Sequence, residues 1–257
     1  MASLTDKIAF ITGASAGIGK ACAHAFAREG ANLILTARRG ERIEALAQTL
    51  SAQHKIRCHW EKLDIRDQPA VESFVRDLPP EFRAVEILLN NAGLSRGLSP
   101  LHQGELQDWE EMIDTNLKGL LYVTRALLPG MVERGRGHIV NIGSIAGRQV
   151  YPGGNVYCAT KFAVRALTQG MLMELANTPI RVSAVDPGLT ETEFSLVRFH
   201  GDAERAAGVY KGIESLRGED IADAVLYVVT RPPHVNVAEM VMLPTAQGSV
   251  HHINRKG

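Results

Sequence analysis

The sequence has few cysteines, no excess of charge and no long apolar segment. Its three cysteines, Cys22, Cys58 and Cys158, have neither the spacing of a metal site nor the even count of a disulfide framework. Lys and Arg together number 28, as do Asp and Glu, so the net charge is near zero. This balance gives no electrostatic reason to expect nucleic acid or an anionic membrane as a partner.

Targeting signals are also missing from the 257 residues. No apolar run is long enough to cross a bilayer, and no basic segment followed by an apolar stretch opens the sequence. We therefore expect a cytoplasmic protein without a signal peptide or membrane span. No internal repeat or low-complexity segment occurs, and the 45% of apolar residues suffice for a sizeable core.

Short apolar runs alternate along the chain with longer segments of helical periodicity. Because the runs are apolar on both faces, they predict a parallel sheet covered by helices on both sides. Pro79-Pro80 and Pro232-Pro233 fall inside this alternation, so we expect one α/β domain over residues 1–257. Strands are predicted at 8–12, 33–36, 56–63, 87–90, 138–142, 182–185 and 237–242. Helices are predicted at 20–29, 41–53, 70–78, 109–132 with at most one interruption, 156–175 and 221–229.

A glycine-rich loop, Thr12-Gly13-Ala14-Ser15-Ala16-Gly17-Ile18-Gly19, joins the first predicted strand to a helix. Gly13 permits a sharp turn, whereas Gly17 and Gly19 let the backbone approach a phosphate and the helix approach the sheet. The N-terminus of the helix adds free N–H groups for a pyrophosphate. Three glycines alone also suit a plain strand–helix turn. Their position after the first strand favours a dinucleotide site in an open, doubly wound Rossmann-type sheet over an eight-unit β/α barrel.

The end of the second predicted strand indicates which dinucleotide binds. An NAD-specific site commonly places an acidic residue there, but the sequence reads Thr36-Ala37-Arg38-Arg39, with no acid before Glu41. Two guanidinium groups suit a ribose 2′-phosphate, which they hold by charge-assisted hydrogen bonds. The alternative is a solvated basic start of a helix. We predict NADP as the cofactor.

Three polar residues suit proton transfer at a carbonyl. Tyr157 and Lys161 are four apart on a predicted helix and so share one face, and Ser144 follows the fifth predicted strand. A tyrosine phenol has an ordinary pKa of about 10, and a neighbouring ammonium favours the phenolate. Lowering that pKa by about 3 units requires roughly 4 kcal/mol, which one solvent-screened ion pair does not supply. A partly dry site would supply this energy if two positive charges, the Lys161 ammonium and an oxidised nicotinamide, lay beside the phenol. The alternative is a Tyr–Lys pair on the protein surface.

Together these motifs resemble the short-chain dehydrogenase/reductase family over essentially the whole chain. The resemblance includes Asn90-Asn91-Ala92-Gly93, Asn116 and Pro187-Gly188. It implies a Rossmann-type fold of about seven parallel strands. Within the family the chain is most similar to the NADP-dependent 3-hydroxy acid dehydrogenases, which oxidise L-allo-threonine, serine and related acids. That closer similarity is carried by residues 153–157, 192–199 and 231–236.

The resemblance also implies catalytic roles. Tyr157 would be the general acid and base, and Ser144 would hydrogen-bond the same substrate oxygen. Lys161 would lower the pKa of Tyr157 and contact the nicotinamide ribose. Asn116 would help hold a water relay from Lys161 to solvent.

The resemblance further implies a set of cofactor contacts. Residues of the glycine loop would bind the pyrophosphate, Asp64 and Ile65 the adenine, and Asn91 the nearby ribose. Pro187 to Thr192 would line the nicotinamide, with Thr190 or Thr192 near its carboxamide. The full predicted set is Gly13, Ser15, Gly17, Ile18, Gly19, Arg38, Arg39, Asp64, Ile65, Asn91, Tyr157, Lys161, Pro187, Gly188, Thr190 and Thr192.

A substrate carboxylate would require a cation, for which Arg is the natural partner. Arg148 and Arg198 are the candidates, each with a surface charge or a subunit contact as the alternative. We predict that Arg198, with Ser144 and Tyr157, binds the substrate. Arg198 lies in a segment, 188–217, that we expect to form a substrate lid. The tail, 244–257, is predicted to reach a neighbouring subunit of a homotetramer, and no metal site is expected.

Several functions remain open at this stage. The first is hydride transfer between NADP(H) and a small 3-hydroxy acid, such as L-allo-threonine, serine or 3-hydroxypropionate, or the matching semialdehyde or keto acid. A broad carbonyl or secondary-alcohol reductase with an apolar pocket is the second. A non-catalytic NADP sensor would have no use for Ser144, Tyr157, Lys161 and Asn116. A sugar-nucleotide epimerase would require a longer C-terminal substrate region and a different glycine spacing.

Overall fold

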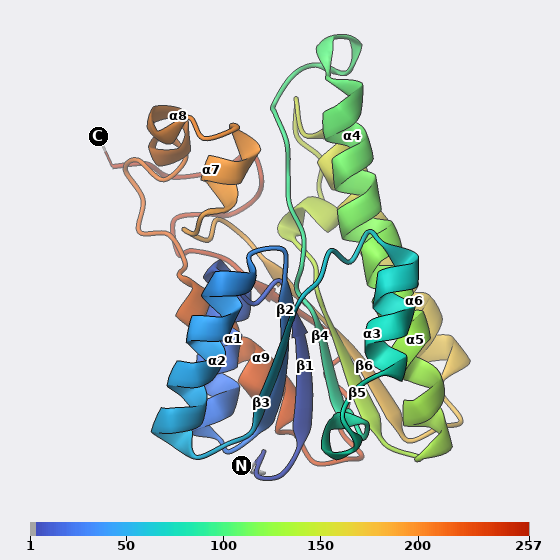
Figure 1. Ribbon diagram of the computed structural model, residues 1–257. Coiled ribbons are helices and arrows are strands. Elements are labelled where there is room, and N and C mark those ends of the chain that lie inside the picture. Colours follow the sequence, from blue (N-terminus) through green and yellow to red (C-terminus); the bar gives the residue numbers. More distant parts are fainter. Residues whose placement is uncertain (1–3, 257) are drawn as a thin grey trace.

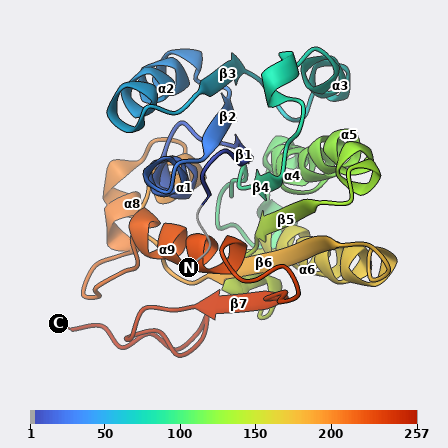
Figure 2. The same ribbon diagram turned by 90° about the horizontal axis from the view of Figure 1, so that it is seen from below.

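The computed structural model describes residues 4–256. Met1–Ser3, where the sequence begins, and Gly257, the last residue of the predicted tail, lie outside this range. Within it, seven parallel strands form one sheet in the order β3-β2-β1-β4-β5-β6-β7 (Figure 2). The strands are β1 (Ile8–Thr12), β2 (Asn32–Ala37), β3 (Cys58–Lys62), β4 (Ile87–Asn90), β5 (Gly137–Ile142), β6 (Ile180–Pro187) and β7 (Glu239–Met242).

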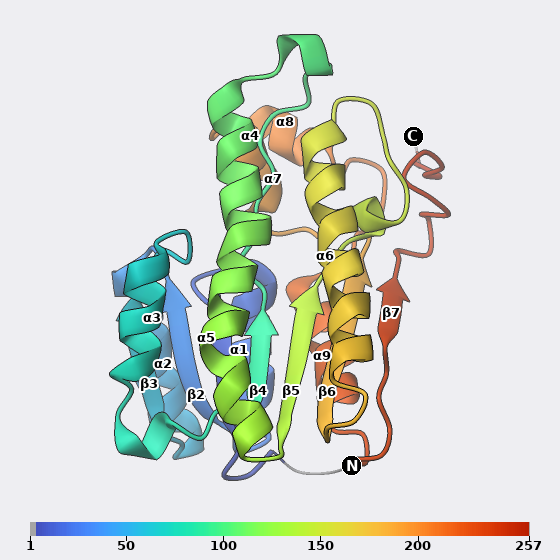
Figure 3. The ribbon, with the colours of Figure 1, turned by 90° about the vertical axis from the view of Figure 1, so that its right-hand side faces the viewer.

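Helices cover both faces of this sheet. α1, α2 and α9 pack on one face, and α3, α5 and α6 on the other (Figure 2). Each face has its own apolar core, because the central strands are buried on both sides. The helices are α1 (Gly17–Arg28), α2 (Gly40–His54), α3 (Gln68–Arg76), α4 (Leu106–Ile113), α5 (Leu120–Glu133), α6 (Asn155–Glu174), α7 (Phe194–Arg198), α8 (Ala203–Gly208) and α9 (Gly218–Val229). Figure 3 shows β4, β5, β6 and β7 of this sheet from the side covered by α5 and α6.

The strand order confirms the predicted doubly wound sheet and excludes a closed barrel. After β3 reaches one edge, the chain returns to place β4 beside β1. This reversal is the switch point at which open α/β sheets bind ligands, at the carboxyl ends of the strands. The carboxyl ends point toward α7 and α8 (Figure 1).

The long helix predicted at 109–132 contains one interruption. A π-helical segment, Asp114–Gly119, separates α4 from α5. Such segments occur mostly inside α-helices and often at functional sites. Asn116 lies in this segment and is buried.

Other predicted boundaries were less accurate. The strands predicted at 56–63 and 237–242 are shorter, as β3 and β7. Both are edge strands, so their ladders end where the single neighbouring strand stops pairing. α7 and α8 were not predicted, because helices of five and six residues carry too little periodicity.

The described part of the tail, residues 244–256, contacts its own chain. Gln247 Oε1 accepts a hydrogen bond from Leu189 N at 2.8 Å, and Lys256 N donates to Gly212 O at 2.7 Å. The tail therefore packs on the predicted lid, and its contact with a neighbouring subunit stays a prediction. In residues 4–256 no helix has the length and apolar character needed to cross a membrane.

Candidate active site

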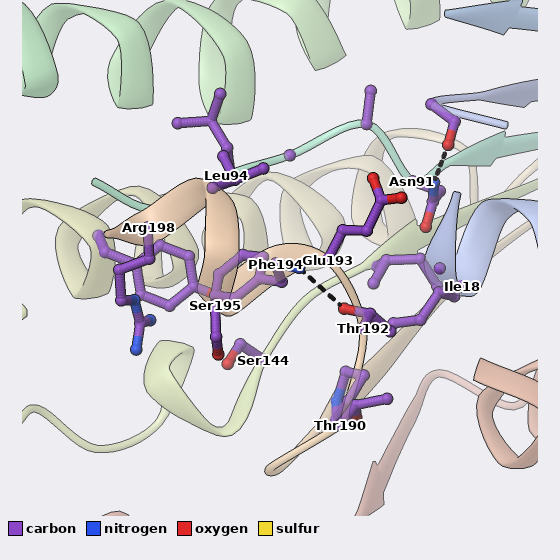
Figure 4. A pocket seen from close by; sticks show the side chains of 18 of the residues that line it. Ile18, Asn91, Leu94, Ser144, Thr190, Thr192, Glu193, Phe194, Ser195 and Arg198 are labelled. Atoms are coloured by element: carbon purple, nitrogen blue, oxygen red, sulfur yellow. Dashed lines mark hydrogen bonds between the residues drawn. The ribbon is translucent and has the colours of Figure 1, made fainter. Parts of the chain in front are cut away.

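A cavity of about 490 Å³ opens at the carboxyl ends of the strands, between the glycine loop and α7 (Figure 4). Gly19, Asn116 and Arg148 are not part of its wall. The other predicted site residues line it: Gly13, Ser15, Gly17, Ile18, Arg38, Arg39, Asp64, Ile65, Asn91, Ser144, Tyr157, Lys161, Pro187, Gly188, Thr190, Thr192 and Arg198.

The glycine loop is held against the segment that follows β4. Gly13 has a φ of +67°, and a Cβ there would lie 2.9 Å from Ala92 Cα, so both conformation and space require glycine. The Asn91 amide donates hydrogen bonds to Thr12 O at 2.9 Å and Gly13 O at 3.2 Å. A Cβ on Gly19 would overlap this amide. Asn91 thus fixes the loop, and its predicted contact with a ribose stays a prediction.

The predicted phosphate-binding arginines lie beside the glycine loop. Arg39 Nε and Nη2 donate to Ser15 Oγ at 3.1 and 3.0 Å, and Arg38 forms an ion pair with Glu111 at 3.0 Å. Glu193, from the predicted lid, pairs with Arg39 and with Arg42 at 2.7 Å. Two guanidinium groups and a serine hydroxyl at the N-terminal end of α1 form a donor set suited to a phosphate.

On the adenine side, Asp64 is held by Arg66. Arg66 Nη2 pairs with Asp64 Oδ2 at 2.6 Å, and hydrogen bonds from Arg66 lower the pKa of this carboxyl against the opposing effect of burial. Ile65 packs against Gly119 of the π-helical segment. Both residues line the cavity, and their contact with adenine stays a prediction.

α6 carries Tyr157 and Lys161 into the cavity wall, where both are buried. Lys161 Nζ donates to Ile142 O, at the end of β5, at 2.8 Å. Asn116 lies behind the wall: its Oδ1 accepts from Leu94 N at 2.8 Å, and its Nδ2 donates to Thr160 Oγ1 at 3.1 Å. A Cβ on Gly93 would lie 3.2 Å from Asn116 Oδ1 and 3.6 Å from Lys161 Nζ. Both polar groups therefore lie next to Gly93.

Burial shifts the pKa of both members of the Tyr157–Lys161 pair. Burial raises the pKa of Tyr157 above its ordinary value, and the nearby Tyr151 adds to the increase, whereas Ser144 and Arg198 lower it. Burial also lowers the pKa of Lys161 to about 8, against the opposing effect of Asp186. The predicted acidification of the phenol is therefore not achieved by the chain's own groups, because desolvation outweighs them.

The two candidate substrate cations lie in different places. Arg198, on α7, reaches the cavity, where its Cζ lies 5.5 Å from the centre of the Tyr157 ring. Its Nη2 donates to Tyr151 Oη at 3.1 Å, and its buried Nε has no hydrogen-bond partner among residues 4–256. Arg148 instead pairs with Asp186 at 2.7 Å and also with Glu239, so Arg148 is wrong as a candidate for the substrate carboxylate.

The position of α7 follows from contacts made by the loop after β4. Arg96 Nη1 donates to Val197 O at 2.6 Å, and Gly97 N donates to Arg198 O at 2.9 Å. At the other end of the helix, Thr192 Oγ1 accepts from Phe194 N at 3.2 Å (Figure 4). These contacts hold Arg198 over the same cavity that Ser144 lines.

Sequence reasoning missed several residues of the wall. Tyr151 follows Ser144 in the loop between β5 and α6, and its hydroxyl is the partner of Arg198. Further missed residues come from α7, from the segment after α8 and from the tail, among them Phe194, Tyr210, Gln247, Val250 and Ile253. No periodicity marks them, since they belong to short helices and irregular segments.

Comparisons with known proteins agree with this geometry. A 3-hydroxy acid dehydrogenase, named as NADP-dependent and as YdfG, from Salmonella typhi is 47% identical over 95% of this chain and 99% of its own. The sulfoacetaldehyde reductase 2 of Chromohalobacter salexigens is 46% identical over 94% of this chain and 96% of its own.

A solved structure, the closed form of serine dehydrogenase complexed with NADP⁺, superposes with a TM-score of 0.90 at 43% identity, covering 97% of this chain and 100% of the other. The profile of short chain dehydrogenases matches residues 7–201, which contain the glycine loop, Ser144, Tyr157 and Lys161. With its seven-stranded sheet and these residues around one cavity, the chain belongs to the short-chain dehydrogenase family and is an oxidoreductase of CH–OH groups.

Proposed function

We propose that this protein transfers a hydride between NADP(H) and a small 3-hydroxy acid, such as L-allo-threonine, serine or 3-hydroxypropionate, or the matching semialdehyde or keto acid. One observation carries the choice of substrate: the guanidinium of Arg198, which has no carboxylate partner among residues 4–256, lines the cavity beside the Tyr157 phenol. The names of the two relatives and of the solved structure support an NADP-dependent enzyme and a small polar or anionic substrate.

The residues on the glycine-loop side of the cavity fit NADP. Arg38 and Arg39 would hold the 2′-phosphate, with Ser15 between the loop and Arg39. The N–H groups at the start of α1 would hold the pyrophosphate. When bound, NADP⁺ supplies the hydride acceptor and a positive charge at the nicotinamide. Glu193 pairs with Arg39, so a 2′-phosphate would compete with this carboxylate.

Tyr157 would move the proton. In oxidation its phenolate would take the proton of the substrate hydroxyl, and in reduction the phenol would protonate the carbonyl oxygen. Ser144 would donate a hydrogen bond to the same oxygen, where negative charge develops. Tyr157 is buried, so a charge brought near its phenol is screened less than it would be in water. Lys161 and Arg198 are the cations of this chain that line the same part of the cavity wall.

Arg198 would bind the substrate carboxylate. Its Nε is buried and unsatisfied, a state that costs free energy unless a ligand supplies the acceptor. Tyr151 orients the guanidinium from one side, and Phe194 packs 5.0 Å from Arg198 Cζ. Because Arg198 and Tyr157 lie side by side, a substrate with its carboxylate and hydroxyl only two carbons apart would reach both.

The test is a comparison of initial rates with NADP⁺ and a panel of alcohols. We expect kcat/KM for serine, L-allo-threonine or 3-hydroxypropionate to exceed that for neutral secondary alcohols of equal size at least tenfold. A broad carbonyl reductase would show the reverse order, since an apolar pocket gains from apolar substrates. Tight NADPH binding without turnover of any substrate would point to a sensor.

The choice of NADP predicts the effect of Arg38→Asp. Replacing the guanidinium with a carboxylate removes charge-assisted hydrogen bonds to a 2′-phosphate, each worth about 1.5–3 kcal/mol, and adds repulsion. The ratio of kcat/KM for NADP to that for NAD should therefore fall at least tenfold. Arg42→Asp is the control, because Arg42 is a nearby arginine that also forms an ion pair, with Glu193, but does not line the cavity. An equal fall in both variants would contradict the assignment of Arg38.

Assembly as a homotetramer stays part of the proposal. α4, α5 and α6 leave large apolar side chains exposed, among them Leu106 at 67% and Met173 at 74%. Such exposure is typical of surfaces that contact other chains. Light scattering is expected to give four times the mass of 28.0 kDa; a monomer would contradict this prediction. The cytoplasmic location also stays a prediction.

A further inference from the structure

An ion-pair cluster runs from the interior behind the cavity to the protein surface. Its inner member, Asp186, lies at the end of β6 and is only 2% exposed. Arg148 Nε pairs with Asp186 Oδ2 at 2.7 Å, and Arg148 Nη2 bonds to Glu239 at the start of β7. Glu239 in turn accepts from Arg165 Nε at 3.2 Å and from Gln169 at 3.0 Å, both on α6. Nothing in the proposed hydride transfer requires these residues.

The carboxylate of Asp186 lies next to the backbone that holds Lys161. Val185 and Ile142 are register partners on β6 and β5, and Gly143 N donates to Val185 O at 2.8 Å. A Cβ on Gly143 would overlap Asp186 Oδ1, so glycine is required there for the carboxylate to fit. Ile142 O, one residue earlier, is the acceptor of Lys161 Nζ.

Asp186 is the carboxylate that acts on Lys161. Lys161 Nζ donates to Ile142 O and lies beside Gly93, as Asn116 Oδ1 does. Tyr157 and Ser144 line the same cavity as Lys161, and the charged group that acts on Lys161 is Asp186 on β6. Asp186 therefore opposes the effect of burial, which disfavours the ammonium form. Burial also raises the pKa of Asp186 itself, and the adjacent Arg148 guanidinium opposes that increase.

We propose that Asp186 and Arg148 form a positioning pair that keeps Lys161 protonated inside a buried site. Arg148 holds Asp186 as a carboxylate, and the carboxylate holds Lys161 as an ammonium. This inference rests on the proposed roles of Tyr157 and Lys161, because Lys161 favours the Tyr157 phenolate only when Lys161 is charged. The Asp186–Arg148 pair thus contributes to the proton step without touching the substrate.

The proposal predicts the direction in which Asp186→Asn moves the pH profile of alcohol oxidation. Loss of the carboxylate lowers the pKa of Lys161, so Lys161 becomes neutral at a lower pH than in the wild type. Without this neighbouring cation, the Tyr157 phenolate forms only at higher pH. We expect the acid limb of the kcat/KM profile to move up by about one pH unit, equivalent to about a tenfold loss below it. If Asp186 acted directly on Tyr157, removing its negative charge would move the limb down. An unchanged limb or a downward shift would overturn the proposal.

A second measurement does not depend on turnover. The titration of Lys161, followed by nitrogen-15 NMR of lysine side chains and assigned with Lys161→Arg, is expected to move to lower pH by about one unit in Asp186→Asn. Asp186→Glu keeps the charge and should recover most of both shifts. An identical Lys161 midpoint in wild type and Asp186→Asn would refute the pair.

Matched variants separate this pair from the rest of the cluster and from the proposed function. Arg165→Gln removes a charge that pairs with the outer Glu239, so its pH profile should match the wild type. Arg148→Gln should shift the limb in the same direction as Asp186→Asn, with recovery in Arg148→Lys, and carries the test if Asp186→Asn does not fold. Full activity of Tyr157→Phe would reject the proposed function. An inactive Tyr157→Phe with an unshifted Asp186→Asn would reject only this inference.

Discussion

Tyr157→Phe is expected to lower kcat for oxidation of a 3-hydroxy acid by a factor on the order of 10²–10⁴, the range typical of a lost general acid or base. The substitution removes one hydroxyl and keeps the ring, which packs 5.6 Å from Phe194. The fold and the binding of NADPH should therefore persist. Stopped-flow or steady-state absorbance of NADPH measures the rate, and fluorescence titration measures the cofactor affinity.

Tyr227→Phe is the control for this substitution. Tyr227 lies on α9, is 46% exposed and does not line the cavity, so its variant should retain wild-type activity. If Tyr157→Phe kept more than a tenth of the wild-type kcat, another group would have to move the proton. The wild-type oxidation rate should rise with pH, because the buried phenol must lose its proton first and its pKa is raised by desolvation.

Arg198→Met is expected to raise KM for a 3-hydroxy acid by roughly tenfold to a hundredfold or more. Hydrogen bonds to charged groups are worth about 1.5–3 kcal/mol each, and about 1.4 kcal/mol corresponds to a factor of ten. A neutral secondary alcohol makes no such bond, so its kcat/KM should change less than threefold. The measurement is the ratio of kcat/KM for the acid to that for the neutral alcohol. Arg198→Lys keeps the charge but loses the forked geometry, and we expect an intermediate ratio.

Arg205→Met provides the matched control for Arg198. Arg205 lies on α8, in the same predicted lid, and its Cζ is 4.5 Å from the centre of the Phe199 ring. Arg205 does not line the cavity. Its loss removes one positive charge near the site without removing the proposed carboxylate ligand. Equal changes in the two variants would attribute the effect to lid structure or overall charge rather than to a contact with substrate.

The glycine loop, the arginines after β2 and the Tyr157–Lys161 pair could be placed from sequence, because each depends on local order. A strand followed by Gly13, Gly17 and Gly19 admits few structures. Tyr157 and Lys161 share a helix face by periodicity alone. The parallel sheet followed from strands that are apolar on both faces.

The partners of Arg148 and Arg198 could not be placed in this way. Each arginine follows the carboxyl end of a strand, and the neighbouring residues in the sequence do not indicate which groups either arginine contacts. Their surroundings differ because β6 and β7 place Asp186 and Glu239 beside Arg148, whereas α7 places Arg198 in the wall of the cavity. These partners are 38 and 91 residues from Arg148 in the chain.

By itself, the sequence determined the doubly wound sheet, the dinucleotide loop and the helix that carries Tyr157 and Lys161, since periodicity and short motifs encode local conformation. Only the tertiary structure decided which arginine faces the cavity and how burial changes the proton affinities of Tyr157 and Lys161. The physical reason is that desolvation and ion pairing depend on distance in space. Residues far apart in the chain determine both the desolvation and the ion pairing.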